Sequence, residues 1–188
     1  MIAGLVLSGG EGRRFGGTEK ALLRLAGRPL LSHVIALLAP QVGALAISGR
    51  PLLAPFAEGY PILPDGGFAG RGPLAGLLAG LEWAASIGAA SLLSMPVDTP
   101  FFPRDLAARL APPPAVVVCD GRVHHLVALW PVAAAAAVRA RLAGGGGAVA
   151  LAGVGCREVV FAAEDGWFAN INTPEALAAA ERRVAGHC

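Results

Sequence analysis

Residues 2–20 read IAGLVLSGGEGRRFGGTEK, and this stretch decides the fold. It opens with Ile2–Leu7, an apolar run with the length of a buried β-strand. Glycines follow, and a glycine-rich backbone can turn sharply and bring its N–H groups close to an anion. Two cations, Arg14 and Lys20, can neutralise the remaining charge of that anion. This order predicts a phosphate-binding loop, and the residues expected to take part are Leu7, Ser8, Gly9, Gly10, Arg14 and Lys20.

Two well-known phosphate-binding motifs do not describe this loop. The Walker A motif has Ser or Thr after its lysine, whereas Lys20 is followed by Ala21. The dinucleotide-binding fingerprint needs a third glycine at the position that holds Phe15. A plain turn between a strand and a helix is the alternative interpretation. The cations at Arg14 and Lys20, with few other charges nearby, favour the phosphate site.

The composition indicates one α/β domain over residues 1–188, because this length and 55% hydrophobic residues suit a single large core. No apolar run reaches about 18 residues, the length that a membrane-spanning helix needs. No basic stretch precedes the first strand, so we expect no signal peptide. The sequence therefore predicts a cytoplasmic protein that does not bind membranes.

Charge and metal-binding residue types exclude further classes. A net charge of +2 with scattered basic residues does not favour nucleic-acid binding. The cysteines are odd in number and widely spaced, so we expect reduced thiols rather than a metal site or disulfides: Cys119, Cys156 and Cys188. The histidines are too scattered to predict a zinc site.

Strand-like and helix-like segments alternate along the chain. Strands are expected at residues 2–7, 44–47, 61–64, 90–95, 116–119, 126–130 and 158–161, and helices at 29–38, 73–85, 103–110, 132–142 and from 173 onward. Asp120 and Gly121 are typical of a β-hairpin turn. The alternation predicts an α/β fold with three layers, in which a mostly parallel sheet contains one antiparallel hairpin.

Asp98 is the second candidate functional residue. It follows the strand at 90–95 within Pro96-Val97-Asp98-Thr99-Pro100, and ligands of open α/β sheets bind beyond the carboxyl ends of the strands. A carboxylate opposite a phosphate-binding loop suits Mg²⁺, which prefers carboxylate and phosphate oxygens. The alternative is a cap for the helix at 103–110, although Thr99 and Asp105 are nearer to that helix.

The opening stretch also resembles a known family. The pattern L-x-G-G-x-x-x-R-M-G-x-x-K begins the nucleotidyltransferases that act on the molybdenum cofactor, and the guanylyltransferases among them are the most similar. It falls here on Leu7, Gly9, Gly10, Arg14, Gly16 and Lys20. Later segments match in the same order: G-P-L-A-G at 72–76, P-V-D-T-P at 96–100, a histidine at His125 and N-I-N-T-P-E at 170–175.

The resemblance implies a Rossmann-like nucleotidyltransferase fold and a reaction. In that reaction GMP passes from GTP to molybdopterin, with or without molybdenum, and pyrophosphate leaves. Arg14, Lys20 and Asp98 would be catalytic, Asp98 would hold Mg²⁺, and Asp65 would help to bind the nucleotide. Residues implied on the acceptor side are Gly72, Pro73, Gly76, Asn170 and Asn172. Other cofactor-biosynthesis proteins and recipient molybdoenzymes are implied partners.

Several alternatives stay open at this point. Asp65 could be an exposed turn residue, Asn172 could cap the following helix, and His125 could be a buried structural histidine. A cytidylyltransferase that uses CTP, or a non-catalytic module that binds nucleotide or pterin, is the rival function. The family pattern also changes at Phe15, at Glu19 in place of Asp, and at Ile47 in place of a polar asparagine.

Overall fold

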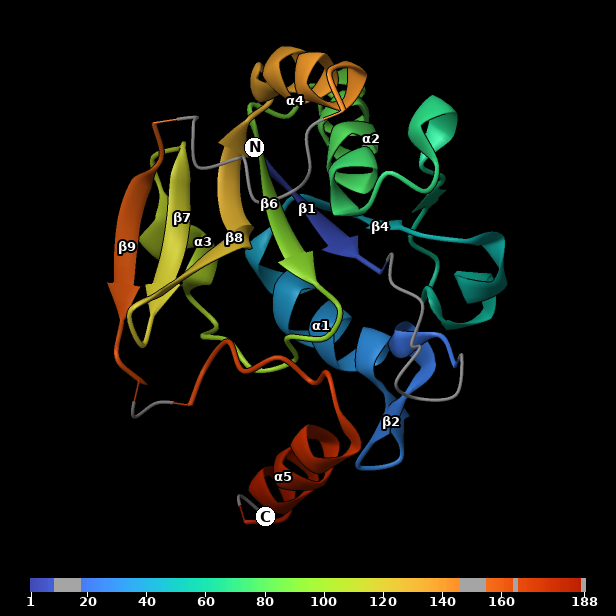
Figure 1. The fold of residues 1–188 in the computed structure, drawn as a ribbon, viewed down its shortest axis with the longest axis vertical. Helices are drawn as coiled ribbons and strands as arrows, with labels where there is room; N and C mark the ends of the chain where they lie inside the picture. Colours follow the sequence, from blue (N-terminus) through green and yellow to red (C-terminus); the bar gives the residue numbers. More distant parts are fainter. Residues whose placement is uncertain (9–17, 146–154, 164–165, 187–188) are drawn as a thin grey trace.

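The structure is a computed structural model, and it describes residues 1–8, 18–145, 155–163 and 166–186. In these residues a seven-stranded sheet runs in the order β5-β4-β1-β6-β8-β7-β9 (Figure 1). Its strands are β1 (Ile2–Leu7), β4 (Ala44–Ser48), β5 (Ile62–Leu63), β6 (Ser91–Pro96), β7 (Ala115–Cys119), β8 (Arg122–Pro131) and β9 (Arg157–Phe161). Only β8 is antiparallel to its neighbours in this sheet. The predicted α/β class with one antiparallel departure is confirmed.

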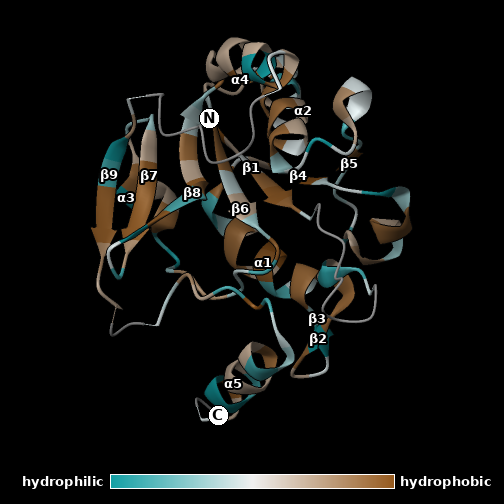
Figure 2. Cartoon of the chain, in the orientation of Figure 1, coloured by the Kyte–Doolittle hydropathy of each residue, from teal (hydrophilic) through white to brown (hydrophobic). Residues whose placement is uncertain are grey.

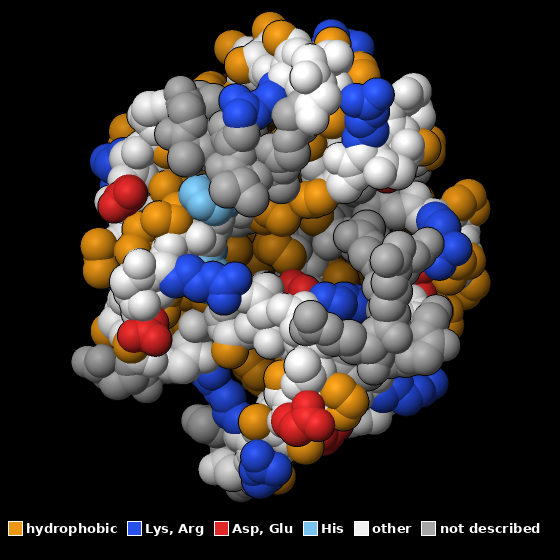
Figure 3. All heavy atoms as spheres, in the orientation of Figure 1, with side chains coloured by type: hydrophobic (Ala, Val, Ile, Leu, Met, Phe, Trp, Pro, Cys, Tyr) orange, Lys and Arg blue, Asp and Glu red, His pale blue; other side chains and the backbone are white. Residues whose placement is uncertain are grey.

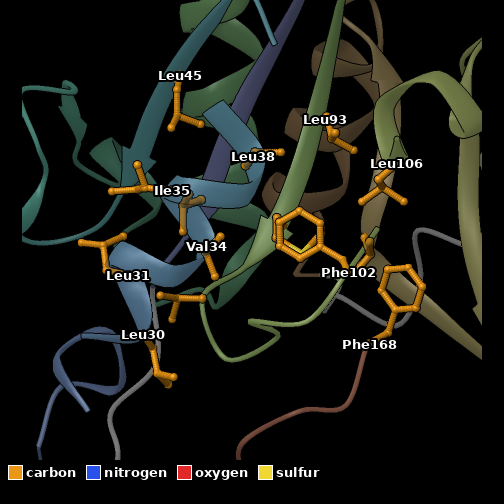
Figure 4. Close-up of a cluster of buried hydrophobic side chains, with 14 of the residues drawn as sticks. Leu30, Leu31, Val34, Ile35, Leu38, Leu45, Leu93, Phe102, Leu106 and Phe168 are labelled. Atoms are coloured by element: carbon orange, nitrogen blue, oxygen red, sulfur yellow. The ribbon is translucent and has the colours of Figure 1, made fainter. Parts of the chain in front are cut away.

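Helices cover both faces of the sheet and make the three layers. They are α1 (Leu30–Leu38) and α3 (Leu106–Leu110) on one face, and α2 (Pro73–Ser86) and α4 (Ala134–Ala143) on the other. A fifth helix, α5 (Pro174–Ala185), lies apart from these layers at the bottom of Figure 1. One buried cluster joins α1 and α3 to side chains such as Val6, Leu45 and Leu93 of the central strands (Figure 4). The next residues along these strands point the other way, toward α2 and α4. This burial on both faces explains why β1, at the centre of the sheet, is apolar throughout (Figure 2).

A small hairpin, β2 (Arg24–Leu25) with β3 (Arg28–Pro29), lies outside the main sheet, in a segment for which the sequence predicted no strand. Its two turn residues, Ala26 and Gly27, both have positive φ, as a tight two-residue hairpin requires. The hairpin touches α5, because the Glu181 carboxylate accepts a hydrogen bond of 2.8 Å from the Ala26 N–H. This bond holds α5 beside the β2–β3 hairpin at the bottom of the view (Figure 1).

The predicted helix at 103–110 is too long at its amino-terminal end, since α3 begins at Leu106. Tertiary contacts hold the preceding backbone out of helical geometry. The Pro103 carbonyl accepts from the Gln41 side chain at 3.2 Å, and the Phe101 carbonyl accepts from the Phe168 N–H at 2.9 Å. The expected strand at 126–130 is too short instead, because β8 begins directly after the hairpin turn, at Arg122.

In the described ranges, no helix has both the length and the apolar character needed to cross a membrane. The parallel strands β5, β4, β1 and β6 all end at the same edge of the sheet. The segments that follow them are therefore brought together in space, and they carry most of the residues that the sequence singled out.

Candidate active site

The ends of three neighbouring strands are tied together at this edge. Ser8 follows β1, and both its N–H (3.0 Å) and its hydroxyl (2.5 Å) donate to the Ser48 carbonyl at the end of β4. On the other side, the Val97 N–H donates to the Leu7 carbonyl at 3.0 Å. Ser8 is buried, with 1% of its surface exposed. These bonds hold the carboxyl ends of β4, β1 and β6 in place beside one another.

Two glycines allow the close packing of this floor. A Cβ atom at Gly49 would lie 2.3 Å from Ser8 Oγ, and one at Gly76 would lie 2.1 Å from Ser48 Oγ. Gly72 precedes α2 with a φ of 74°, which favours glycine. The sequence placed Gly72, Pro73 and Gly76 on the acceptor side. In the structure Gly72 allows a positive φ and Gly76 allows close packing on Ser48, while Pro73 lines a cavity beside Lys20.

Lys20 and Asp98 form the charged centre of the site. Lys20 Nζ lies 2.8 Å from Asp98 Oδ2, and the same ammonium donates to the Asn172 side-chain oxygen. The second oxygen of Asp98 accepts from Asn170 Nδ2 at 3.0 Å and from the Thr99 hydroxyl at 3.3 Å. The side chains of Lys20 and Asp98 are only 20% and 15% exposed, so water screens this pair weakly.

The segment with the two asparagines is held against the Asp98 loop by its backbone. The Ile171 N–H donates to the Asp98 carbonyl at 2.8 Å, and the Ile171 side chain is buried. Its neighbours Asn170 and Asn172 consequently both reach the charged centre. The helix cap is Thr173, whose hydroxyl accepts from the Ala176 N–H at 3.2 Å. Asn172 contacts Lys20 and not the first turn of α5.

Asp65 stands at the same edge, just beyond β5. Its carboxylate accepts a hydrogen bond of 3.4 Å from the Ser48 hydroxyl, and its surface is partly buried rather than open. Burial raises the pKa of Asp65, and the hydrogen bond from Ser48 opposes that rise. In the order of the sheet, Asp65 follows β5, Ser48 ends β4, Ser8 follows β1 and Asp98 follows β6.

The departures from the family pattern have structural counterparts. Glu19 Oε2 accepts from Arg50 Nε at 3.1 Å and from Arg50 Nη2, whereas the Lys20 ammonium donates to Asp98 and Asn172. Ile47 is completely buried against the α1 side of the sheet, where a polar nucleotide contact has no place. Gly9, Gly10 and Arg14 lie outside the described residues.

A cavity of about 160 Å³ opens over this centre, with Leu7, Ser8, Lys20, Pro73, Asp98 and Asn170 in its lining. Figure 3 shows a hollow with a hydrophobic floor in this face of the molecule. A sequence search for acids and cations missed Ser48 and Thr99. The position of Ser48 could have indicated its role, because it lies at the carboxyl end of a parallel strand, just as Ser8 does.

One carboxylate is available here for a divalent cation. Within residues 1–8, 18–145, 155–163 and 166–186, no three His, Cys, Asp or Glu side chains gather to hold a metal by themselves. An ionised carboxylate offers about four lone-pair positions, and the three donors on Asp98 leave one. Asp98 thus fits Mg²⁺ that is held mainly by substrate phosphates and water.

Solved structures share this fold. A molybdopterin-guanine dinucleotide biosynthesis protein A from Archaeoglobus fulgidus aligns with a TM-score of 0.76 at 22% identity, over 98% of this chain and 99% of that one. A nucleotidyl transferase from Methanothermobacter thermautotroptrophicus aligns with a TM-score of 0.75 at 18% identity, over 100% and 99% of the two chains. At these identities the likeness concerns the fold alone.

The fold, together with relatives of higher identity, defines the protein as a nucleotidyltransferase. The chain belongs to the family of the MobA-like NTP transferase domain, whose model matches residues 4–158. The molybdenum cofactor guanylyltransferase of Acidiphilium cryptum (strain JF-5) is 54% identical and covers 100% of this chain and 96% of its own. The molybdenum cofactor guanylyltransferase of Rhodobacter capsulatus is 49% identical, over 97% of this chain and 96% of that protein. The family expected from the sequence is confirmed.

Proposed function

We propose that this chain transfers GMP from GTP to molybdopterin, with or without bound molybdenum, and releases pyrophosphate. Relatives that are 54% and 49% identical over nearly their full length carry the name of this activity. The observation that carries the proposal is the Lys20–Asp98 pair, which lies at the carboxyl edge of the sheet beside Ser8. In one cavity, a cation can bind phosphate oxygens and a carboxylate can hold Mg²⁺, so two anionic substrates can be brought together there.

The chemistry needs positioning and charge neutralisation and no covalent intermediate. An oxygen of the acceptor phosphate bonds to the α-phosphorus of GTP, and the bond from that phosphorus to the pyrophosphate oxygen breaks. Lys20 donates to phosphate oxygens and stabilises the charge that develops on the leaving pyrophosphate. The sequence pattern assigns the same role to Arg14 and to the backbone amides of Gly9 and Gly10. Asn172 and Asn170 orient Lys20 and Asp98 through their hydrogen bonds.

Asp98 would hold Mg²⁺, which when bound would supply positive charge that neutralises substrate phosphates. Asp65 would accept hydrogen bonds from N–H donors of the guanine base. Because Asp65 and Asp98 follow β5 and β6, with β4 and β1 between them, the base and the reacting phosphate would lie along one edge. We further propose that residues 1–188 form one nucleotidyltransferase domain that acts in the cytoplasm.

The test is Mg²⁺-dependent product formation with molybdopterin as acceptor and GTP or CTP as donor. Mass spectrometry of the product identifies the base, and pyrophosphate release gives the rate. The proposal expects the guanine dinucleotide and pyrophosphate with GTP only. Cytosine dinucleotide alone would keep the mechanism and overturn the base assignment. Nucleotide binding without release from either donor would establish a binding module instead.

A further inference from the structure

The last described helix, α5, follows part of the charged centre but buries little apolar surface of its own. Asn172 stands two residues before the helix and accepts a hydrogen bond from the Lys20 ammonium. Among the twelve residues of α5, all of which the structure describes, only Ala180 is buried, and Leu177 and Val184 are half-buried. A helix with so few buried apolar contacts depends on its polar contacts to stay in place.

Polar contacts hold the far end of α5. Arg183 donates to the Gly166 carbonyl, and its guanidinium carbon lies 4.3 Å from the centroid of the Phe101 ring. Glu181 accepts a hydrogen bond of 2.8 Å from the Ala26 N–H. Ala26 lies outside the paired register of the β2–β3 hairpin, so the carboxylate satisfies an N–H that the two strands leave unpaired. The Glu181 bond thus ties α5 to the hairpin.

The hairpin belongs to the same hydrogen-bonded unit as Lys20. This residue begins the short helix η2 (Lys20–Leu22), which leads directly into β2. The Leu23 N–H donates to the Lys20 carbonyl at 3.1 Å, and the Leu30 N–H donates to the Leu23 carbonyl at 2.9 Å. These bonds join η2, the hairpin and the start of α1, and the position of Lys20 depends on that unit.

The segment around α5 is therefore attached to this unit at two points. Before the helix, Asn172 accepts from Lys20 itself, and near the end of the helix Glu181 accepts from Ala26. Two separated attachments fix the orientation of a helix, whereas a single attachment leaves it free to pivot. A side chain at a reaction centre keeps its geometry only when the surrounding contacts hold it in that way.

We propose that Glu181 is a positioning residue for Lys20. By holding α5 against the hairpin, it keeps the Asn172 side chain in hydrogen-bond contact with the Lys20 ammonium. Glu181 acts through Asn172 and does not touch the substrates. The effect on turnover rests on the proposed function, in which Lys20 stabilises the charge on the leaving pyrophosphate. Without the Glu181 bond, α5 pivots and the ammonium spends less time in the orientation that the reaction needs.

NMR of the Lys20 ammonium tests the positioning without any substrate. Lys20 is the only lysine in the sequence, so lysine labelled with an NMR-active nitrogen isotope gives a single side-chain signal. Asn172→Ala removes the contact outright and defines the displaced position of that signal. Glu181→Ala is expected to move the signal toward this position, and Glu181→Gln, which keeps an oxygen acceptor, is expected to leave it near the wild-type position. Arg182→Ala, at an exposed position of the same helix, is the matched control.

Kinetics test the consequence for the reaction. Glu181→Ala is expected to lower kcat by about three- to tenfold, as the loss of one hydrogen bond implies, while the Kd for GTP changes by less than about twofold. In an Asn172→Ala background, the same substitution is expected to change kcat by less than about twofold, because the contact through which Glu181 acts is already lost. A merely structural role would give the same loss in both backgrounds.

The outcomes separate this inference from the proposed function. A Lys20 signal at the wild-type position in Glu181→Ala, with product formed at the wild-type kcat, overturns the positioning role and leaves the function standing. A displaced signal, in a protein whose wild type forms no product from GTP and molybdopterin, supports the positioning and overturns the function. Equal losses of kcat with and without the Asn172 side chain would show that Glu181 acts on the fold in general, which contradicts the proposal.

Discussion

Lys20 and Asp98 are separated by 78 residues in sequence and joined by an ion pair of 2.8 Å. In the substrate-free chain each charge is therefore neutralised by the other. A nucleotide phosphate that recruits Lys20 takes a partner from Asp98, and a cation that binds Asp98 takes a partner from Lys20. Nucleotide and metal binding are expected to be coupled through this pair.

The coupling predicts an unusual effect of Asp98→Asn on GTP binding without metal. Removing the carboxylate frees Lys20, so GTP affinity in EDTA should rise by roughly fivefold, equivalent to about 1 kcal/mol. In a Lys20→Met background the same substitution should give a smaller gain. Isothermal titration of the four proteins measures the difference, and equal gains in both backgrounds would show that Lys20 is not the carrier.

Lys20→Met should impair turnover much more than substrate binding. Its ammonium is assigned to charge that develops on the leaving pyrophosphate, and losing such a stabiliser costs about 2–4 kcal/mol in the transition state. The expected fall in kcat is thus roughly 30- to 1,000-fold. Steady-state kinetics with GTP and molybdopterin measure it. A raised KM with unchanged kcat would assign Lys20 to ground-state binding only.

Gly76→Ala should destabilise the fold although alanine favours helices. The new Cβ would lie 2.1 Å from Ser48 Oγ, and relieving that clash breaks the contact of Ser48 with Asp65. The expected cost is about 1–3 kcal/mol in the free energy of unfolding, measured in urea. Gly67→Ala is the control, because no atom lies within 4 Å of the position of its Cβ. Equal stability of the two variants would contradict the packing account.

Asp65→Asn should weaken GTP binding and raise the free energy of unfolding at pH 7. Burial raises the folded-state pKa of Asp65, so the folded chain binds more protons than the unfolded chain between the two pKa values, and stability falls as pH rises through that window. The neutral amide removes this penalty, and at pH 7 the variant should unfold at higher urea concentration while binding GTP more weakly. A variant less stable than wild type at pH 7 would show that the carboxylate stabilises the fold.

The main elements of the fold could be predicted because local signals and tertiary structure agree there. The apolar run of β1 is buried on both faces, and Pro73 begins α2 as a first-turn proline does. The helix expected from residue 103 fails because Gln41, far away in sequence, binds the Pro103 carbonyl. No local pattern contains that contact.

The charged residues of the candidate site could be predicted from the sequence, but the hydrogen bonds that connect them could not. A carboxylate after a buried strand identified Asp98, since strand ends define the crevice. The side-chain partners of Asn170 and Asn172 depend on a backbone bond from Ile171 to Asp98, which joins distant segments. The β-bulge in β8, where residues 125–127 have no partner in β7, could not be predicted for a similar reason. It depends on the register between two strands, and the sequence of one strand does not determine that register.

The measurement that tests the central claim most directly is the turnover of Asp98→Ala beside Asp105→Ala. Both remove one carboxylate, but Asp105 is an exposed residue at the start of α3, paired at 4.0 Å with Arg109. With GTP, Mg²⁺ and molybdopterin, we expect Asp98→Ala to lose nearly all formation of the guanine dinucleotide and Asp105→Ala to retain it. Ordinary turnover by a folded Asp98→Ala would contradict the assignment of Asp98 to the reaction centre.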